Sequence, residues 1–204
     1  MILSSFSTKG GVGKTTLAQN IAEALGLPLF DFDPQRDAIR WNGMGISKTS
    51  CAEVPEVGIR KFLNKYANAK DLVVCDLPPG SPGLPIAALS ELCIIPTRPG
   101  EADLVALGRA LKHLNQAKKS GNPDMKIAVV LTQARVASTR TVTVDQALQQ
   151  MAAREGFTYL GVLHHRVAIE MAGAKGCGLL HCGDGAAAHE FREILNGIHE
   201  VLSS

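Results

Sequence analysis

The sequence predicts a doubly wound α/β fold, in which helices flank a mostly parallel sheet. Short apolar runs alternate with longer amphipathic stretches along the chain, which is the pattern of consecutive βα units. The 204 residues are 46% hydrophobic but only 4% aromatic, which suits helices packed closely on a sheet better than an aromatic-rich sandwich. We therefore expect one domain over residues 1–204, with ligands at the carboxyl ends of the strands.

The first half of the chain contains three expected strands and one helix. Residues 2–6 form an apolar strand that leads into a glycine-rich loop, and residues 15–25 follow as a helix ended by Gly26. Residues 29–32 predict a second strand. Residues 72–76 are almost wholly apolar and end on an acid, as expected of a strand buried in a parallel sheet.

The second half of the chain continues the alternation. Leucines at helical spacing make residues 101–119 the clearest helix. Pro96 is expected to end the strand before it, because proline has no N–H to donate. Residues 43–58 hold several Gly, Ser and Pro, and we expect a loop there. The other expected elements are strands at 92–95, 127–131 and 158–163 and helices at 142–155 and 186–202.

Composition and charge exclude several classes of protein. No apolar run approaches the roughly 20 residues that cross a bilayer, and no signal peptide is recognisable, so we expect a soluble cytoplasmic protein. A net charge of +2 is weak support for a polyanionic partner. Without a C-x-x-C pair, we expect reduced thiols at all the cysteines. These are Cys51, Cys75, Cys93, Cys177 and Cys182.

The segment KGGVGKTT, residues 9–16, has the features of a phosphate-binding loop between a strand and a helix. Its glycines leave room for backbone N–H groups to face an anion at the helix N-terminus. Lys14 supplies a positive charge for the terminal phosphates, and the Thr15 hydroxyl suits magnesium. Thr8 stands where the common loop pattern has glycine. The expected nucleotide-binding residues are Lys9, Gly10, Gly11, Val12, Gly13, Lys14, Thr15 and Thr16.

Acidic residues at two strand ends complete the expected chemistry. Phosphoryl transfer needs one acid near the metal and another that orients the attacking water. Asp76 ends an apolar strand and has the position of the metal-binding acid. Asp31 and Asp33 lie on the same side of the neighbouring strand, so on this pattern alone either could orient the water.

Together these residues resemble the motifs of ParA-type ATPases, in the ParA/MinD group of P-loop proteins. KGGVGKTT is similar to the deviant Walker A motif, DFDPQ at 31–35 to the A′ motif, and DLPP at 76–79 to the Walker B motif. The resemblance implies the P-loop NTPase type of fold. It also accounts for Thr8, because this subclass replaces the first glycine of the loop.

The resemblance assigns roles to individual residues. The first lysine of the loop is the signature lysine, so Lys9 is expected to reach across an ATP-sandwiched dimer to the partner's phosphates. Asp33 becomes the better candidate for orienting water, and Asp76 is expected to bind magnesium indirectly. Residues 9, 14 and 33 are thus the expected catalytic set, with ATP or ADP and Mg²⁺ as the ligands. Pro99 and the segment 132–133 are candidate adenine contacts.

The resemblance also implies a function. ParA-type proteins bind double-stranded DNA non-specifically as ATP dimers and position cargo on the nucleoid. Weak intrinsic ATP hydrolysis is expected to be stimulated by a ParB-like partner and DNA. Arg166 is the first candidate for DNA contact, followed by Arg135 and Arg140. Plasmid, chromosome region, carboxysome and chemoreceptor cluster all remain open as cargo.

Two other functions remain as alternatives. A metabolic P-loop enzyme, such as a small-molecule kinase or an ATP-dependent ligase, would not need Lys9. A MinD-like membrane-associated ATPase would need a basic C-terminal helix, whereas residues 186–202 carry three glutamates and one arginine. The chain begins almost directly with its first strand, so we expect the short, plasmid-type form without an N-terminal DNA-binding extension.

Overall fold

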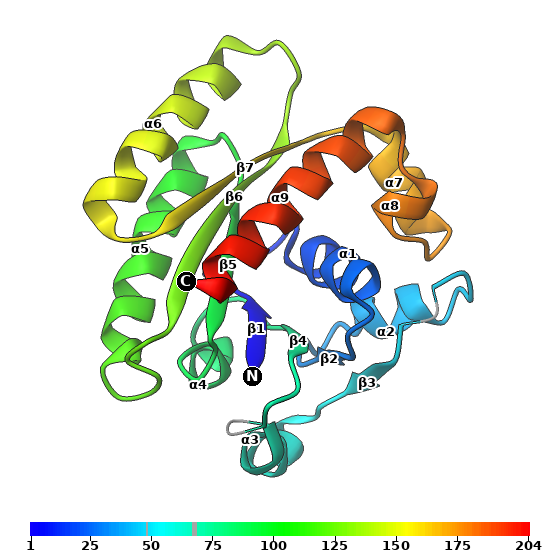
Figure 1. The fold of residues 1–204 in the computed structure, drawn as a ribbon, viewed down its shortest axis with the longest axis vertical. Coiled ribbons are helices and arrows are strands. Elements are labelled where there is room, and N and C mark those ends of the chain that lie inside the picture. The colour runs from blue at the N-terminus through cyan, green and yellow to red at the C-terminus, as the bar shows by residue number, and fades with distance from the viewer. Residues whose placement is uncertain (48, 67–68) are drawn as a thin grey trace.

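A parallel seven-stranded sheet runs through the described part of this computed structural model, residues 1–47, 49–66 and 69–204 (Figure 1). In their order across the sheet, the strands are β3 (Cys51–Glu53), β2 (Leu29–Asp31), β4 (Val73–Asp76), β1 (Ile2–Ser5), β5 (Leu92–Thr97), β6 (Lys126–Ala134) and β7 (Thr158–His164). Every neighbouring pair is parallel. On one side of β1 the chain forms β2 and β3 and then inserts β4 between β1 and β2; on the other side it forms β5, β6 and β7 in turn. This order confirms the predicted doubly wound fold.

Helices cover both faces of this sheet, as the alternation of elements predicted. One face carries α1 (Lys14–Leu25), α2 (Asp37–Asn42), α7 (Val167–Ala174), α8 (Leu179–Cys182) and α9 (Gly185–Ser203). The other carries α3 (Ile59–Tyr66), α4 (Leu84–Ala87), α5 (Glu101–Lys118) and α6 (Thr139–Glu155). Two short 3₁₀ turns, η1 (Glu56–Gly58) and η2 (Ser81–Gly83), precede α3 and α4. In Figure 1, α9 crosses in front of the sheet beside α1.

The strands send alternate side chains into two hydrophobic clusters, one on each face. In β1, Ile2 packs with the side chains of α3 to α6, and Leu3 packs with those of α1 and α9. Val73 and Val74 of β4 repeat this alternation. Because β1 and β4 are buried on both faces, packing fixes their carboxyl ends, where the phosphate loop and Asp76 begin.

Strand β5 continues beyond its predicted end, so the expectation that Pro96 stops it is wrong. Pro96 lies in register with Val130 of β6. The Ile94 carbonyl accepts a hydrogen bond from the Phe6 N–H on the β1 side, and by alternation position 96 faces that same side. The pairing of β1 with β5 ends at Ser5, opposite Ile94, so the N–H that proline lacks has no partner strand there.

The expected loop at residues 43–58 contains a strand that the sequence pattern does not reveal. Cys51 of β3 lies opposite Leu29 of β2 at the edge of the sheet. Two of the three β3 residues are exposed, so backbone pairing rather than an apolar pattern holds this strand. Residue 48 of the expected loop lies outside the described residues.

The expectation of five reduced thiols is wrong for two of them. Cys177 and Cys182 form a disulfide, because the short helix α8 brings their Cα atoms to 6.0 Å, within the range that a disulfide spans. The other cysteines are free thiols, and Cys75 and Cys93 are fully buried in the core. Cys51 is only partly buried.

The C-terminal helix α9 uses its apolar face inside the protein. Phe191, Ile194 and Ile198 are buried in the cluster that α9 shares with α1 and the sheet. The apolar face of α9 is therefore used for packing within the protein. Among the described residues, no helix has both the length and the apolar character needed to cross a membrane.

Candidate functional site

The glycine-rich segment forms a loop that joins β1 to α1. Gly11 and Gly13 have φ angles of 71° and 95°, which glycine adopts much more readily than other residues. Two side chains from the end of β6 hold the loop. The Thr132 hydroxyl donates to the Val12 carbonyl at 2.7 Å, and the Gln133 amide donates to the Gly11 carbonyl at 2.9 Å. The protein itself thus fixes the shape of the loop in front of the N-terminus of α1.

Lys14, the first residue of α1, is buried to an unusual degree for a lysine. Only 6% of its surface is exposed, and it makes no ion pair with any described residue. A buried ammonium without a contacting counterion is unfavourable, because it has lost water and only the more distant Asp76 carboxylate offsets its charge. Lys14 therefore lies where an anionic ligand would complete its surroundings.

Asp76, at the end of β4, is a buried carboxylate that lies near the Thr15 hydroxyl without a well-formed hydrogen bond to it. Both of its oxygens are inaccessible and unpaired among the described residues. Burial raises its pKa to about 7, although the Thr15 hydroxyl and the Lys14 charge act in the opposite direction. Carboxylate and hydroxyl oxygens suit magnesium and its bound waters, so Asp76 and Thr15 fit the metal that the resemblance implies.

The two acids at the end of β2 have different surroundings. Asp31 is buried, and its two oxygens accept hydrogen bonds from the backbone N–H groups of Asp33 and Ile39, at 2.9 and 3.2 Å. Burial raises the pKa of Asp31, although these bonds lower it. One oxygen of Asp33 accepts only from the Gln35 N–H, at 3.0 Å. Asp31 thus shapes the turn, and Asp33 keeps an oxygen available for water.

Some of these groups line a cavity of about 310 Å³ at the carboxyl ends of the strands, whereas the buried Asp31 and Asp76 are absent from its lining. Asp33 enters it from the A′ segment and Pro79 from the Walker B segment, facing the loop. The lining consists of Gly10, Gly11, Gly13, Lys14, Thr15, Thr16, Asp33, Gln35, Asp37, Pro79 and Gln133. Most of the predicted loop residues therefore meet at one cavity. Val12 is an exception, because its side chain is buried and is absent from this lining.

A second cavity of about 340 Å³ adjoins the first, sharing Gly13, Thr16 and Gln133 with it. Trp41, Thr132, the segment 164–166 and part of α7 also line it. This places the predicted segment 132–133 beside the loop. Pro99 lies in neither lining, so the structure gives no support to its predicted contact with adenine.

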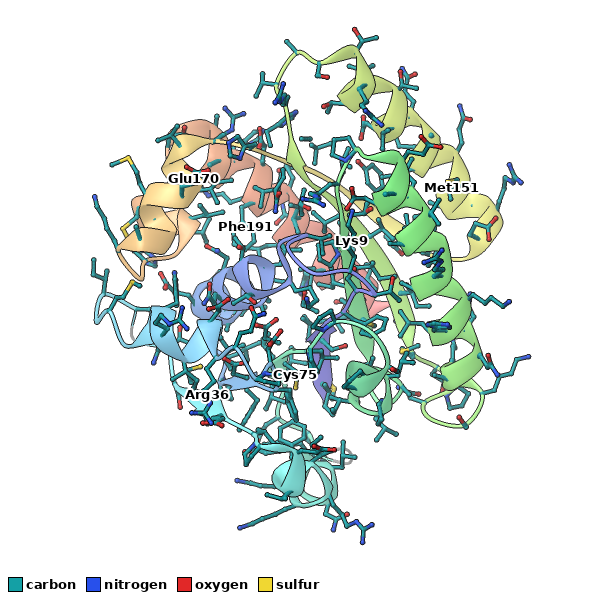
Figure 2. The ribbon with its side chains drawn as sticks, turned by 180° about the vertical axis from the view of Figure 1, so that it is seen from behind. Lys9, Arg36, Cys75, Met151, Glu170 and Phe191 are labelled. Atoms are coloured by element: carbon teal, nitrogen blue, oxygen red, sulfur yellow. A yellow bond between two sulfur atoms is a disulfide. The ribbon has the colours of Figure 1, made fainter. Side chains whose placement is uncertain are left out.

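Lys9 does not enter the cavity of the loop that it begins. Its Nζ lies 2.9 Å from the Asp103 carboxylate in the first turn of α5. Figure 2 shows Lys9 on the loop before α1. Asp103 is an acid in the first turn of a predicted helix, which is recognisable in the sequence, but its contact with Lys9 is not.

The predicted DNA-binding arginines differ in their exposure and in whether they form an ion pair. Arg135 and Arg140 are exposed near the end of β6 and the start of α6. Arg166 lines the second cavity and pairs with Glu190 of α9. Burial favours a higher pKa for Glu190, but hydrogen bonds from Arg166 and His164 outweigh it and lower the pKa. Arg166 is thus already engaged within its own subunit.

Comparison with known proteins agrees with this geometry. Residues 3–179 match the model of the CobQ/CobB/MinD/ParA nucleotide binding domain family. A relative named maintenance of carboxysome distribution protein A, from Halothiobacillus neapolitanus, is 31% identical over 96% of this chain and 94% of its own.

Two solved structures share the fold. The ATP complex of a variant McdA from Cyanothece has a TM-score of 0.80 at 15% identity, over 97% of this chain and 96% of its own. The cell division protein MinD from Aquifex aeolicus has a TM-score of 0.71 at 15% identity, over 98% and 96% of the two chains. The chain therefore belongs to the CobQ/CobB/MinD/ParA nucleotide-binding domain family, and within it to the ParA type of ATPase.

Proposed function

We propose that this chain, acting as one domain over residues 1–204, is an ATPase that positions cargo through an ATP-dependent dimer. The observation that carries the proposal is the burial of two neighbouring ionisable groups. Lys14 lines the cavity without an ion pair among the described residues, and Asp76 is buried at the end of β4 with both oxygens inaccessible. A buried ammonium and a buried carboxylate that do not contact each other are both compensated when a nucleotide phosphate and a magnesium ion bind together.

The residues around the cavity then have separate tasks. The loop N–H groups and Lys14 bind the phosphates, and Asp33 orients the attacking water. Thr15 and Asp76 would hold a magnesium ion, and the ion would supply positive charge beside the phosphate oxygens. Gln133 and the second cavity receive the nucleoside. Lys9 is proposed to serve the partner subunit's nucleotide, because its own cavity does not include it.

Dimer formation explains how ATP controls attachment to DNA. Two subunits joined through their nucleotides present two sets of weak DNA contacts, and linked contacts bind far more tightly than single ones. Arg135 and Arg140 are the exposed members of the proposed contact set, with Arg166 beside them. The binding would be sensitive to salt and tolerant of sequence. The proposed location is therefore the nucleoid.

The cargo is proposed from the relatives. The 31% identical relative is named for the maintenance of carboxysome distribution, and a second relative from Gloeobacter kilaueensis carries the same name. A carboxysome-like assembly is therefore the first candidate, ahead of a plasmid or chromosome region. A ParB-like adaptor would connect the ATPase to this cargo and stimulate hydrolysis, as an arginine supplied in trans can do by about 10³- to 10⁵-fold.

One experiment tests the proposal as a whole. The protein is mixed with magnesium and a non-hydrolysable ATP analogue, and its mass is measured by light scattering before and after addition of non-specific duplex DNA. We expect a dimer that forms only with the analogue and only then retains DNA. A chain that stays monomeric under these conditions would reduce the function to simple nucleotide hydrolysis.

A further inference from the structure

We propose that Asp103 is a positioning residue that holds Lys9 within its own subunit until the dimer closes. The inference rests on the proposed function, because it concerns the proposed role of Lys9 in the partner's site. Its starting point is the ion pair between the Lys9 ammonium and Asp103 Oδ1, 2.9 Å apart. A Lys9 side chain that extends into the partner subunit's site moves away from this carboxylate, so the two contacts compete.

The Asp103 carboxylate is fixed in place by its surroundings. Its side chain is 8% exposed, and its backbone N–H donates to the Gly100 carbonyl at the start of α5. A side chain at position 100 would collide with the carboxylate, so the glycine there permits the close approach. The Thr8 hydroxyl donates to the Ala106 carbonyl at 3.0 Å, which docks the start of the loop on the same helix.

A second cation makes the ion pair releasable. Arg98 Nε lies 3.0 Å from Asp103 Oδ1, the same oxygen that Lys9 contacts. If Lys9 leaves, this buried carboxylate keeps a counterion that stays charged at all ordinary pH values. Removing one partner from a buried pair is very unfavourable only when it leaves an uncompensated charge. Lys9 can therefore leave Asp103 at a modest free-energy cost.

The arrangement sets a threshold for dimer formation. Asp103 competes with the partner's triphosphate for Lys9, and the triphosphate carries the larger charge. The Lys9 side chain is 34% exposed, so it can change partners without disturbing the core. At low ATP concentration the lysine remains on Asp103 and the subunits stay apart. Weakening this hold should lower the ATP concentration that dimer formation needs.

Two substitutions should act in opposite directions. Asp103→Asn removes the competing charge, and we expect the concentration of ATP analogue for half-maximal dimer formation to fall about three- to tenfold. Arg98→Ala leaves Lys9 as the only close counterion of Asp103, so the same concentration should rise. Glu101→Gln is the matched control, because Glu101 is an exposed acid in the same helical turn and should have no effect.

A measurement without nucleotide tests the ion pair by itself. Urea unfolding of Lys9→Met, Asp103→Asn and the double variant should be non-additive, because each single change already removes the pair. Additive effects would mean that the pair does not form. If Asp103→Asn folds poorly, Arg98→Ala carries the test alone, because it changes a side chain that is one-third exposed.

The outcomes separate this inference from the proposed function. A wild-type chain that never dimerises with the analogue overturns the proposed function and the role of Asp103 with it. A wild-type chain that dimerises, with the same midpoint in Asp103→Asn and Arg98→Ala, overturns the role of Asp103 alone. Opposite shifts of the two midpoints support it, since a purely structural role would move both in one direction.

Discussion

Two regions at the carboxyl ends of the strands, called here the first and second stretch, differ in the burial and pairing of their charged groups. At the ends of β1, β2 and β4, Lys14 and Asp76 are buried and lack partners within the described chain. At the ends of β6 and β7, Arg135 is exposed and Arg166 is paired with Glu190. The first stretch is incomplete without a ligand, whereas the second is complete as it stands.

This difference indicates two kinds of binding. Buried, unpaired charges bind a compact ligand of opposite charge strongly, because they have already lost their water. Exposed charges remain hydrated and screened by salt, so each contributes little to binding. Substitutions should therefore have large effects in the first stretch and small, salt-dependent effects in the second.

The largest effect is expected for Lys14→Ala. It removes the cation that faces the phosphates, and we expect nucleotide affinity to fall by at least about 100-fold, because a charge-assisted contact is lost in a buried site. Isothermal titration with ATP and magnesium measures this. Lys119→Ala, at an exposed lysine after α5, is the control. Unchanged affinity in Lys14→Ala would refute the assignment of the loop.

The next effect concerns hydrolysis rather than binding. Asp33→Ala removes the carboxylate proposed to orient water, and hydrolysis should fall by about 100-fold or more while nucleotide affinity changes little. Asp37→Ala is the matched control, because Asp37 lines the same cavity but pairs with Arg40 at 3.2 Å. Equal losses in the two variants would show that Asp33 has no special role.

A third substitution, Asp76→Asn, tests how the buried carboxylate affects the pH dependence of stability. The pKa of Asp76 is raised from 3.8 to about 7 in the folded chain, so between these values the folded state binds more protons than the unfolded state. Stability should therefore fall as pH rises through this window. Asp76→Asn should abolish the fall and stabilise the metal-free protein at pH 8, by at most about 4 kcal/mol, and by less because the amide also lacks partners.

Urea unfolding at pH 5 and pH 8 with a chelator present measures this effect. Added magnesium and nucleotide should reverse the order, because only the wild type can then use its carboxylate to hold the metal. If the two proteins lose stability equally between pH 5 and pH 8, the carboxylate is not the group that titrates.

The sequence predicted the buried stretch better than the exposed one, and the reason is physical. A phosphate loop needs glycines, a lysine and a hydroxyl at fixed spacing, and the buried strands beside it are apolar throughout. Both features can be recognised from the sequence alone. In the structure, Gly10, Lys14 and Asp33 line one cavity. The separate tasks of Asp31 and Asp33 depend on hydrogen bonds that spacing alone does not reveal.

What the sequence missed depends on contacts between distant segments. Strand β3 is held by pairing with β2, and the disulfide depends on the turn of α8 between its cysteines. The partners of Lys9 and Arg166 come from α5 and α9, far along the chain. The sequence does not show whether a lysine or arginine will lie beside an acidic side chain in the folded protein. For this reason the roles predicted for loop residues were more specific than those predicted for arginines.

In the second, exposed stretch, Arg140→Ala should have a small effect on the affinity for DNA. Arg140 is exposed at the start of α6, and the loss of one phosphate contact should lower the slope of log affinity against log salt by about 1 per subunit. Fluorescence anisotropy of the analogue-bound dimer on labelled duplex measures this. Arg154→Ala, at the far end of α6, is the control. No change in slope would exclude Arg140 from the DNA surface.

The smallest effect on DNA is expected for Arg166→Ala, because Glu190 already neutralises this arginine. The substitution should instead act on stability. The lowered pKa of Glu190 stabilises the fold above the pKa of the unfolded chain, and this contribution is lost as pH falls through the folded value. Arg166→Ala should therefore be less stable than wild type at pH 7, by under about 1 kcal/mol, and equal to it in acid, as urea unfolding would show. A salt slope for DNA that changes as much as in Arg140→Ala would mean that Arg166 exchanges Glu190 for phosphate, and the contrast between the two stretches would then fail at this residue.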